Sequence, residues 1–155
     1  MTDLRKLNLE LTKKGIAESV KGDVLIIQAL HVSEELGNVI KRLSVSLKEG
    51  YSYYAPSVLK ISDTTGLIKL VKTKKQEEMG GDFSEEDLKP YLDLASELEN
   101  LIELKEKQQK YLENLMKKIC PNLLRVAGTN VGAKLISLAG SLKHLAELSS
   151  STIQV

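Results

Sequence analysis

The feature that most constrains this chain is the spacing of its apolar residues, which recur at alternating intervals of three and four. Two long stretches carry the pattern, residues 23–50 and 85–119. Such spacing places apolar side chains on one stripe of an α-helix and is typical of a coiled-coil seam. Because residues 51–84 join the two stretches, the pattern predicts an all-α fold with a long antiparallel coiled-coil helical hairpin.

Each predicted helix has a seam that follows from this register. The seam residues of the two helices are Leu25, Ala29, Val32, Leu36, Leu98, Ile102, Lys105, Gln109 and Leu112. Lys105 and Gln109 interrupt an otherwise apolar stripe. Polar residues inside a seam lower stability but can fix the register or the number of partner helices.

Shorter signals place the neighbouring elements. Residues 3–19 carry leucines at near-helical spacing, and Asp23 can cap the helix that follows. Ser84 and Asp87 stand three apart before the second long helix, which resembles a capping box. Residues 76–82 are polar and glycine-rich, so they predict a flexible connection.

The C-terminal part has a different pattern. Residues 122–127 are apolar, residues 128–130 break the pattern, and residues 131–148 predict one more helix with small residues such as Gly132 and Gly140. Residues 149–155 predict a loop and a strand-like tail. We therefore expect a small helical base, with a coiled-coil domain over 1–119 and the start of a second domain at 120–155.

Composition and residue types exclude several functions. Lys and Arg total 22 against 21 Asp and Glu, a net charge of +1, whereas a general nucleic-acid binder is usually basic. Cys120 is the only cysteine, which excludes a disulfide framework, and its place before Pro121 predicts a buried, inert thiol. With two histidines and no phosphate-binding glycine loop, we expect no enzyme activity, no metal site and no cofactor.

Hydropathy bears on the compartment. No apolar run approaches the roughly 20 residues that cross a bilayer, and the N-terminus has no signal-peptide pattern. We expect no membrane partner and an intracellular protein.

The most specific strings lie near the C-terminal end. They are Cys-Pro-Asn-Leu at 120–123, Val-Gly-Ala-Lys-Leu-Ile-Ser-Leu-Ala-Gly-Ser-Leu at 131–142 and Ser-Ser-Thr-Ile-Gln-Val at 150–155. These strings closely resemble the Nop-domain family, and residues 23–29 and 51–56 are similar to its first coiled-coil helix and tip. That family holds archaeal partners of fibrillarin, eukaryotic nucleolar proteins and a pre-mRNA splicing factor.

The resemblance implies an assembly scaffold of a box C/D-type ribonucleoprotein, which guides RNA 2′-O-methylation. Its hairpin would form a homodimer, and its Nop domain would bind a kink-turn protein with box C/D guide RNA. The broad apolar stripes favour such pairing, because two helices do not fully cover them. The alternative is a structural coiled-coil interaction module without an RNA role. In a eukaryote the family location is nuclear or nucleolar, and in an archaeon cytoplasmic.

Departures from the family pattern lie at the tip and at both ends. The tip has Tyr51 and Tyr54-Ala55-Pro56 where the family has Trp-Tyr and His-Phe-Pro, and its insertion is shorter. The family's N-terminal domain, which binds the fibrillarin-type methyltransferase, and the segment that follows Val155 have no counterpart here. We therefore expect a fragment or a short paralogue that reaches the methyltransferase only through that missing domain.

Four residues near the last predicted helix are candidates for RNA contact. They are Asn130, Lys134, Lys143 and His144. Backbone amides at a helix N-terminus can bind phosphate, and the two lysines would add positive charge. The alternative is that Thr129 and Asn130 only cap the helix, while the charged side chains are solvated.

Overall fold

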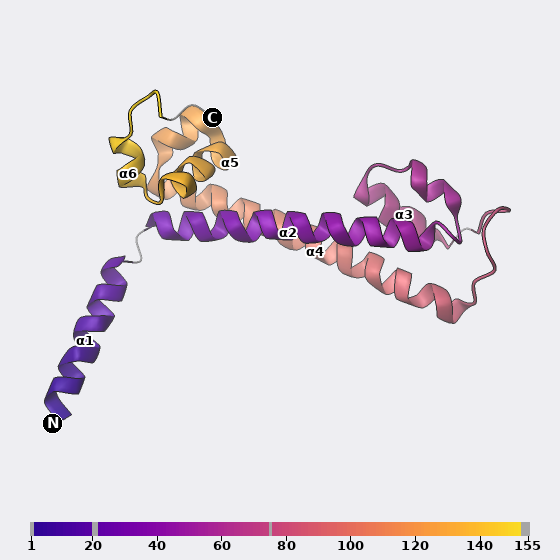
Figure 1. The fold of residues 1–155 in the computed structure, drawn as a ribbon, viewed down its shortest axis with the longest axis horizontal. Coiled ribbons are helices and arrows are strands. Elements are labelled where there is room, and N and C mark those ends of the chain that lie inside the picture. The colour runs from indigo at the N-terminus through magenta and orange to yellow at the C-terminus, as the bar shows by residue number, and fades with distance from the viewer. Residues whose placement is uncertain (1, 20–21, 75, 153–155) are drawn as a thin grey trace. The chain divides into compact units, whose positions relative to one another are not determined.

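The computed structural model describes residues 2–19, 22–74 and 76–152, and all regular structure in these ranges is helical (Figure 1). Its elements are α1 (Thr2–Ser19), α2 (Gly22–Tyr51), the 3₁₀-helix η1 (Pro56–Lys60), α3 (Thr64–Thr73), α4 (Glu85–Ile119), α5 (Pro121–Ala139) and α6 (Leu142–Glu147). The predicted all-α class is confirmed, as are both long helices. No helix in the described ranges is long and apolar enough to cross a membrane.

The chain forms two compact units, and α2 and α4 contribute to both. The tip unit comprises residues 33–108, and the base unit comprises residues 1–32 and 109–155. These units each combine parts of both long helices, whereas the predicted domain boundary divides the chain once, between residues 119 and 120; that boundary stays a prediction. Each unit is described by itself below.

In the tip unit, α2 and α4 lie side by side and run antiparallel. The ring of Tyr51, at the end of α2, lies 6.1 Å from the ring of Tyr91, near the start of α4. Gly37, nearer the start of α2 than Tyr51, faces the side chain of Lys105, which is nearer the end of α4 than Tyr91. Residue numbers therefore rise along one helix as they fall along the other, as the predicted hairpin requires.

The face of α2 that is buried within the chain only partly coincides with the expected seam. Its buried residues are Asp23, Ile26, Ala29, Leu30, Ser33, Ile40, Ser44, Leu47 and Tyr51. Leu25 and Val32 of the expected seam are exposed, Leu36 is half-buried, and the neighbouring Val39 is exposed as well. Spacing of apolar residues does not identify this face, because Ser33, Gly37 and Ser44 lie on it without being apolar; the seam as a contact with another helix stays a prediction. The Ser44 hydroxyl donates to the carbonyl of Ile40, which satisfies it inside the core.

The tip unit is closed by η1 and α3. Val58, Leu67, Ile68 and Val71 join Leu47 and Leu98 in one core. Tyr51, Tyr54, Phe83 and Tyr91 form an aromatic cluster in this unit, with ring centroids 5.4 to 6.3 Å apart. Burial and the nearby Tyr54 hydroxyl raise the pKa of Tyr51. The cluster supplies large apolar area at the point where the chain reverses.

Residues 76–82 are not the loose connection that their composition predicted. The Gly81 amide donates to the carbonyl of Tyr53 at 2.7 Å, and the Ser57 amide donates to Glu77 at 3.0 Å. A Cβ atom at Gly80 would lie 1.8 Å from the carbonyl oxygen of Tyr54. Glycine therefore permits a close approach of two backbones that no other residue allows.

The capping box before α4 is confirmed. The Asp87 amide donates to the Ser84 hydroxyl at 3.2 Å, while the Ser84 amide donates to the Asp87 carboxylate at 3.0 Å. The Ser84 hydroxyl and amide hold the pKa of Asp87 below its usual range. Aspartate thus serves here in place of the commoner glutamate.

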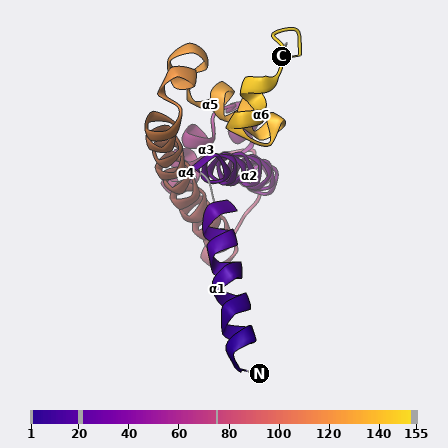
Figure 2. The same cartoon turned by 90° about the vertical axis from the view of Figure 1, so that its left-hand side faces the viewer.

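In the base unit, α5 and α6 pack with the start of α2 and the end of α4 (Figure 2). Ile26, Leu112, Met116 and Ile136 are fully buried in this core. Cys120 is also buried, as predicted, with its sulfur 3.3 Å from that of Met116, and burial raises the pKa of its thiol. A Cβ atom at Gly132 would lie 2.8 Å from Met116, so α5 approaches α4 closely.

The expected single helix over 131–148 is broken in two. Gly140 ends α5 with φ of 79°, and Ser141 caps α6 by accepting a hydrogen bond from the amide of His144. The predicted break before this helix is present at Gly128, with φ of 75° and ψ of 179°. Positive φ favours glycine, which explains why both breaks fall there. Residues 149–152 form a turn, and the expected strand-like tail lies outside the described residues.

Candidate functional site

The start of the last predicted helix links two of the candidate residues. The side-chain amide of Gln109, on α4, donates to the side-chain oxygen of Asn130, on α5, at 2.6 Å. An expected seam residue and an expected RNA-facing residue thus contact each other. The Asn130 oxygen thus accepts a hydrogen bond from another helix, while the side chain stays exposed.

Lys134 lies one turn further along α5 and is exposed. Gly132 and Ala133 on the same helix are buried, whereas Val131 and Leu138 are 53% and 73% exposed. The outer face of α5 therefore presents a lysine between two apolar side chains. Such a face suits a protein partner as well as a phosphate.

Lys143 and His144 lie on α6 and share one acidic neighbour. The Lys143 ammonium is 4.0 Å from the Glu147 carboxylate, and Nδ1 of His144 is 3.9 Å from it. All three side chains are well exposed, so these contacts contribute little to stability. Glu147 nevertheless reduces the positive charge on α6. The spacing of three and four residues could have revealed this neighbour in the sequence.

Asp23 makes a contact with α6 that the sequence did not predict. It is buried, and its carboxylate accepts hydrogen bonds from the amides of Val24 at 3.0 Å and Leu142 at 3.1 Å. The residue expected to cap α2 instead holds the first residue of α6 against α2. No local signal announces this link, because Leu142 is remote in sequence.

A second polar link joins α2 and α5 in the base unit. The Nε2 atom of His31 lies 3.1 Å from the Ser137 hydroxyl. Both links orient α5 and α6, which carry the four candidate residues. No group of three or more potential metal ligands occurs among the residues that the structure describes.

The predicted seam residues divide into buried and exposed sets. On α4, Leu98 and Leu112 are fully buried, Ile102 and Gln109 are half-buried, and Lys105 is exposed with its ammonium over Gly37. On α2, Ala29 is buried and Leu36 half-buried, but Leu25 and Val32 are 40% and 44% exposed. The exposed apolar side chains are not used by the core of their own chain. Their role in pairing with a second chain stays a prediction.

Comparison with known proteins gives a family. The Nop family model, described as a snoRNA binding domain and fibrillarin, matches residues 38–155. Over 94% of its length the chain is 34% identical to an uncharacterized NOP5 family protein of Methanocaldococcus jannaschii, and it covers 42% of that protein. It is 32% identical to nucleolar protein 56 of Dictyostelium discoideum, covering 35% of it, and 29% identical to nucleolar protein 58 of Saccharomyces cerevisiae, covering 36%. The chain thus spans less than half the length of these relatives.

Proposed function

This chain belongs to the Nop family, and we propose on that premise that it is an assembly scaffold of a box C/D-type ribonucleoprotein involved in guided RNA 2′-O-methylation. The observation that carries the proposal is the family match over residues 38–155, which includes η1, α3, α4, α5 and α6. The proposed role is structural rather than catalytic. The proposed location is intracellular, and nucleolar if the source is a eukaryote.

Self-association is the first part of the proposal. Leu25 and Val32 lie two helical turns apart on α2 and are exposed, although both are apolar. Exposed apolar side chains at seven-residue spacing form a stripe that a second helix can cover. A homodimer would bury this stripe, and each chain would present the same surface to the other.

Binding of a kink-turn protein with box C/D guide RNA is the second part. The outer faces of α5 and α6 offer Lys134, Lys143 and His144, while Val131 and Leu138 offer apolar area. Because the net charge is only +1 and Glu147 neutralises part of α6, RNA alone should bind weakly. A joint surface of protein and RNA supplies the apolar contact that RNA alone lacks.

Two measurements test the proposal. In light scattering, we expect a dimer mass for the wild type and a monomer for the double variant Leu25→Glu, Val32→Glu. Because both side chains are already exposed, thermal unfolding of the variant should show that it is folded. A monomeric wild type would contradict the proposed pairing.

The second measurement is a gel shift at physiological salt, with box C/D guide RNA alone and with the same RNA pre-bound to its kink-turn protein. We expect retention of the complex at concentrations where RNA alone is not retained, and weaker retention for Lys134→Ala. Equal retention of both probes would indicate a general RNA binder. A dimer that retains neither probe would favour the structural coiled-coil module.

A further inference from the structure

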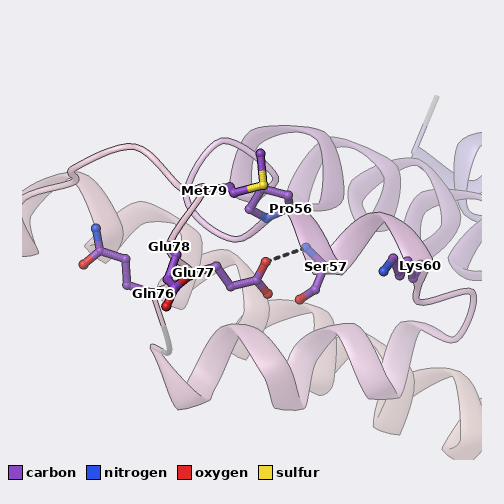
Figure 3. Close-up of a pocket in the computed structure, with 7 residues that line it drawn as sticks. All are labelled: Pro56, Ser57, Lys60, Gln76, Glu77, Glu78 and Met79. Atoms are coloured by element: carbon purple, nitrogen blue, oxygen red, sulfur yellow. Dashed lines mark hydrogen bonds between the residues drawn. The ribbon is translucent and has the colours of Figure 1, made fainter.

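An open groove lies beside η1 in the tip unit (Figure 3). Its volume is about 500 Å³. The lining residues that matter here are Pro56, Ser57, Lys60, Glu77, Glu78 and Met79. It contains none of the seam residues or RNA-facing candidates, so it can be tested separately from the proposed function.

The backbone around this groove is held in place before any partner arrives. The hydrogen bonds from Gly81 to Tyr53 and from Ser57 to Glu77 fix residues 77–81 against the start of η1. The Gly80 backbone lies so close to the Tyr54 carbonyl that a Cβ atom at this position would clash with it. A preformed groove costs little conformational entropy on binding.

Met79 gives the groove an apolar wall. Although it lies on this fixed segment, its side chain is 90% exposed, and Figure 3 shows it above the ring of Pro56. Methionine has a flexible thioether that adapts to differently shaped apolar side chains, and exposed methionines are common at binding surfaces. The wall therefore suits one apolar side chain from a partner.

Among the residues that the structure describes, the groove has a free positive charge on one side and a free negative charge on the other. The Glu77 carboxylate accepts a hydrogen bond from the Ser57 amide, so this carboxylate already has a partner within the chain. Lys60 and Glu78 are exposed, and neither forms an ion pair with any residue in the described part of the chain. In Figure 3 they lie on opposite sides of the Glu77–Ser57 hydrogen bond.

We propose that this groove binds a short segment of another protein in which one apolar side chain stands between an acidic and a basic residue. The apolar side chain packs between Pro56 and Met79, the acidic residue faces Lys60, and the basic residue faces Glu78. A nucleic acid fits poorly, because one lysine next to two carboxylates provides no phosphate-binding cluster. This interaction goes beyond the proposed scaffold function.

Methionine methyl NMR on the full chain tests the proposal. The methionines are Met1, Met79 and Met116, and fully buried Met116 is an internal control. The first probe is a blocked synthetic peptide with Asp, Leu and Lys in that order, separated by Gly-Ser spacers. The second reverses the order to Lys, Leu and Asp, and the third has Ser in place of Leu.

We expect the Met79 methyl signal to shift with both charged leucine peptides, and one order should bind about tenfold more tightly than the other. The serine peptide should give no shift, and the Met116 signal should not move.

The charge-exchanged variant Lys60→Glu, Glu78→Lys sharpens the test, since both positions are exposed and folding should be unaffected. It should reverse the preference between the two leucine peptides. No Met79 shift with either peptide, or equal affinity for both, would overturn the proposal. So would a Met79 shift caused by increasing the concentration of the chain alone, which would make a second copy the occupant. A shift caused by a single-stranded RNA oligonucleotide would do the same.

Discussion

The tip unit and the base unit use the same two long helices but close them by different means. The tip core contains four aromatic rings and a backbone approach that only Gly80 permits. The base core is aliphatic and sulfur-containing among the described residues, and the same unit buries the carboxylate of Asp23. The tip is closed by η1 and α3, which directly follow α2 in sequence. The base is closed by the C-terminal helices α5 and α6, which pack with the start of α2. Substitutions in one unit should therefore leave the other unit's own contacts intact.

The largest effect is expected for Gly80→Ala in the tip unit. The new Cβ would lie 1.8 Å from the Tyr54 carbonyl oxygen, so the backbone has to move. Overpacking typically costs 1–3 kcal/mol, and because the obstacle here is backbone we expect a loss of about 3 kcal/mol. Chemical denaturation would measure it. Gly81→Ala is the matched control, because its Cβ would lie 3.4 Å from the Tyr53 carbonyl oxygen. Equal stability of the two variants would show that the approach at Gly80 is not required.

Gly132→Leu should break the base unit in the corresponding way, with a somewhat smaller effect. A Cβ atom at this position would meet the end of the Met116 side chain at 2.8 Å, and that flexible end can partly give way. We expect a loss of about 2 kcal/mol in thermal or chemical unfolding. The Tyr51 and Tyr91 ring signals in NMR should not change. An unchanged melting temperature would show that this face of α5 is not tightly packed.

Asp23→Ala tests the polar link in the base unit. The substitution leaves the amide of Leu142 without its hydrogen-bond acceptor, and an unsatisfied buried donor costs about 1–3 kcal/mol. We expect a loss near the lower end, about 1 kcal/mol, because water can reach the start of a short helix. Hydrogen exchange of the Leu142 amide should accelerate while amides in α3 keep their protection. Unchanged exchange at Leu142 would exclude the link.

Ser84→Ala should have the smallest effect, about 0.5 kcal/mol, because it removes one helix cap at the surface. The effect should depend on pH, since hydrogen bonds from Ser84 lower the pKa of Asp87 in the folded state. A lowered folded pKa stabilises the protein above the unfolded pKa, near 4, and this contribution disappears as the pH falls through the folded pKa. The difference between variant and wild type should thus shrink in acid. A constant difference from neutral to acid pH would argue against the Asp87 contribution.

The two long helices show how far periodicity carries a prediction. On α4 the buried positions are apolar, so Leu98 and Leu112 could be placed in a core from spacing alone. On α2 the buried positions include Ser33 and Ser44, while Leu25, Val32 and Val39 are exposed. A count of apolar residues therefore did not identify the face of α2 that is buried within its own chain. The hydroxyl of Ser44 can be buried because the carbonyl of Ile40 accepts its hydrogen bond, and spacing does not reveal that.

The sequence by itself determined the helical class, the extents of α2 and α4, the capping box at Ser84 and the break at Gly128. Each depends on residues within a few positions of one another, where local sterics and hydrogen bonding decide the conformation. Only the tertiary structure decided the buried face of α2, the anchoring of residues 76–82 and the link from Asp23 to Leu142. Each of these depends on a partner remote in sequence or on the space left by a missing side chain. Local patterns carry no information about such partners, because the free energy of these contacts arises only when the distant segments meet.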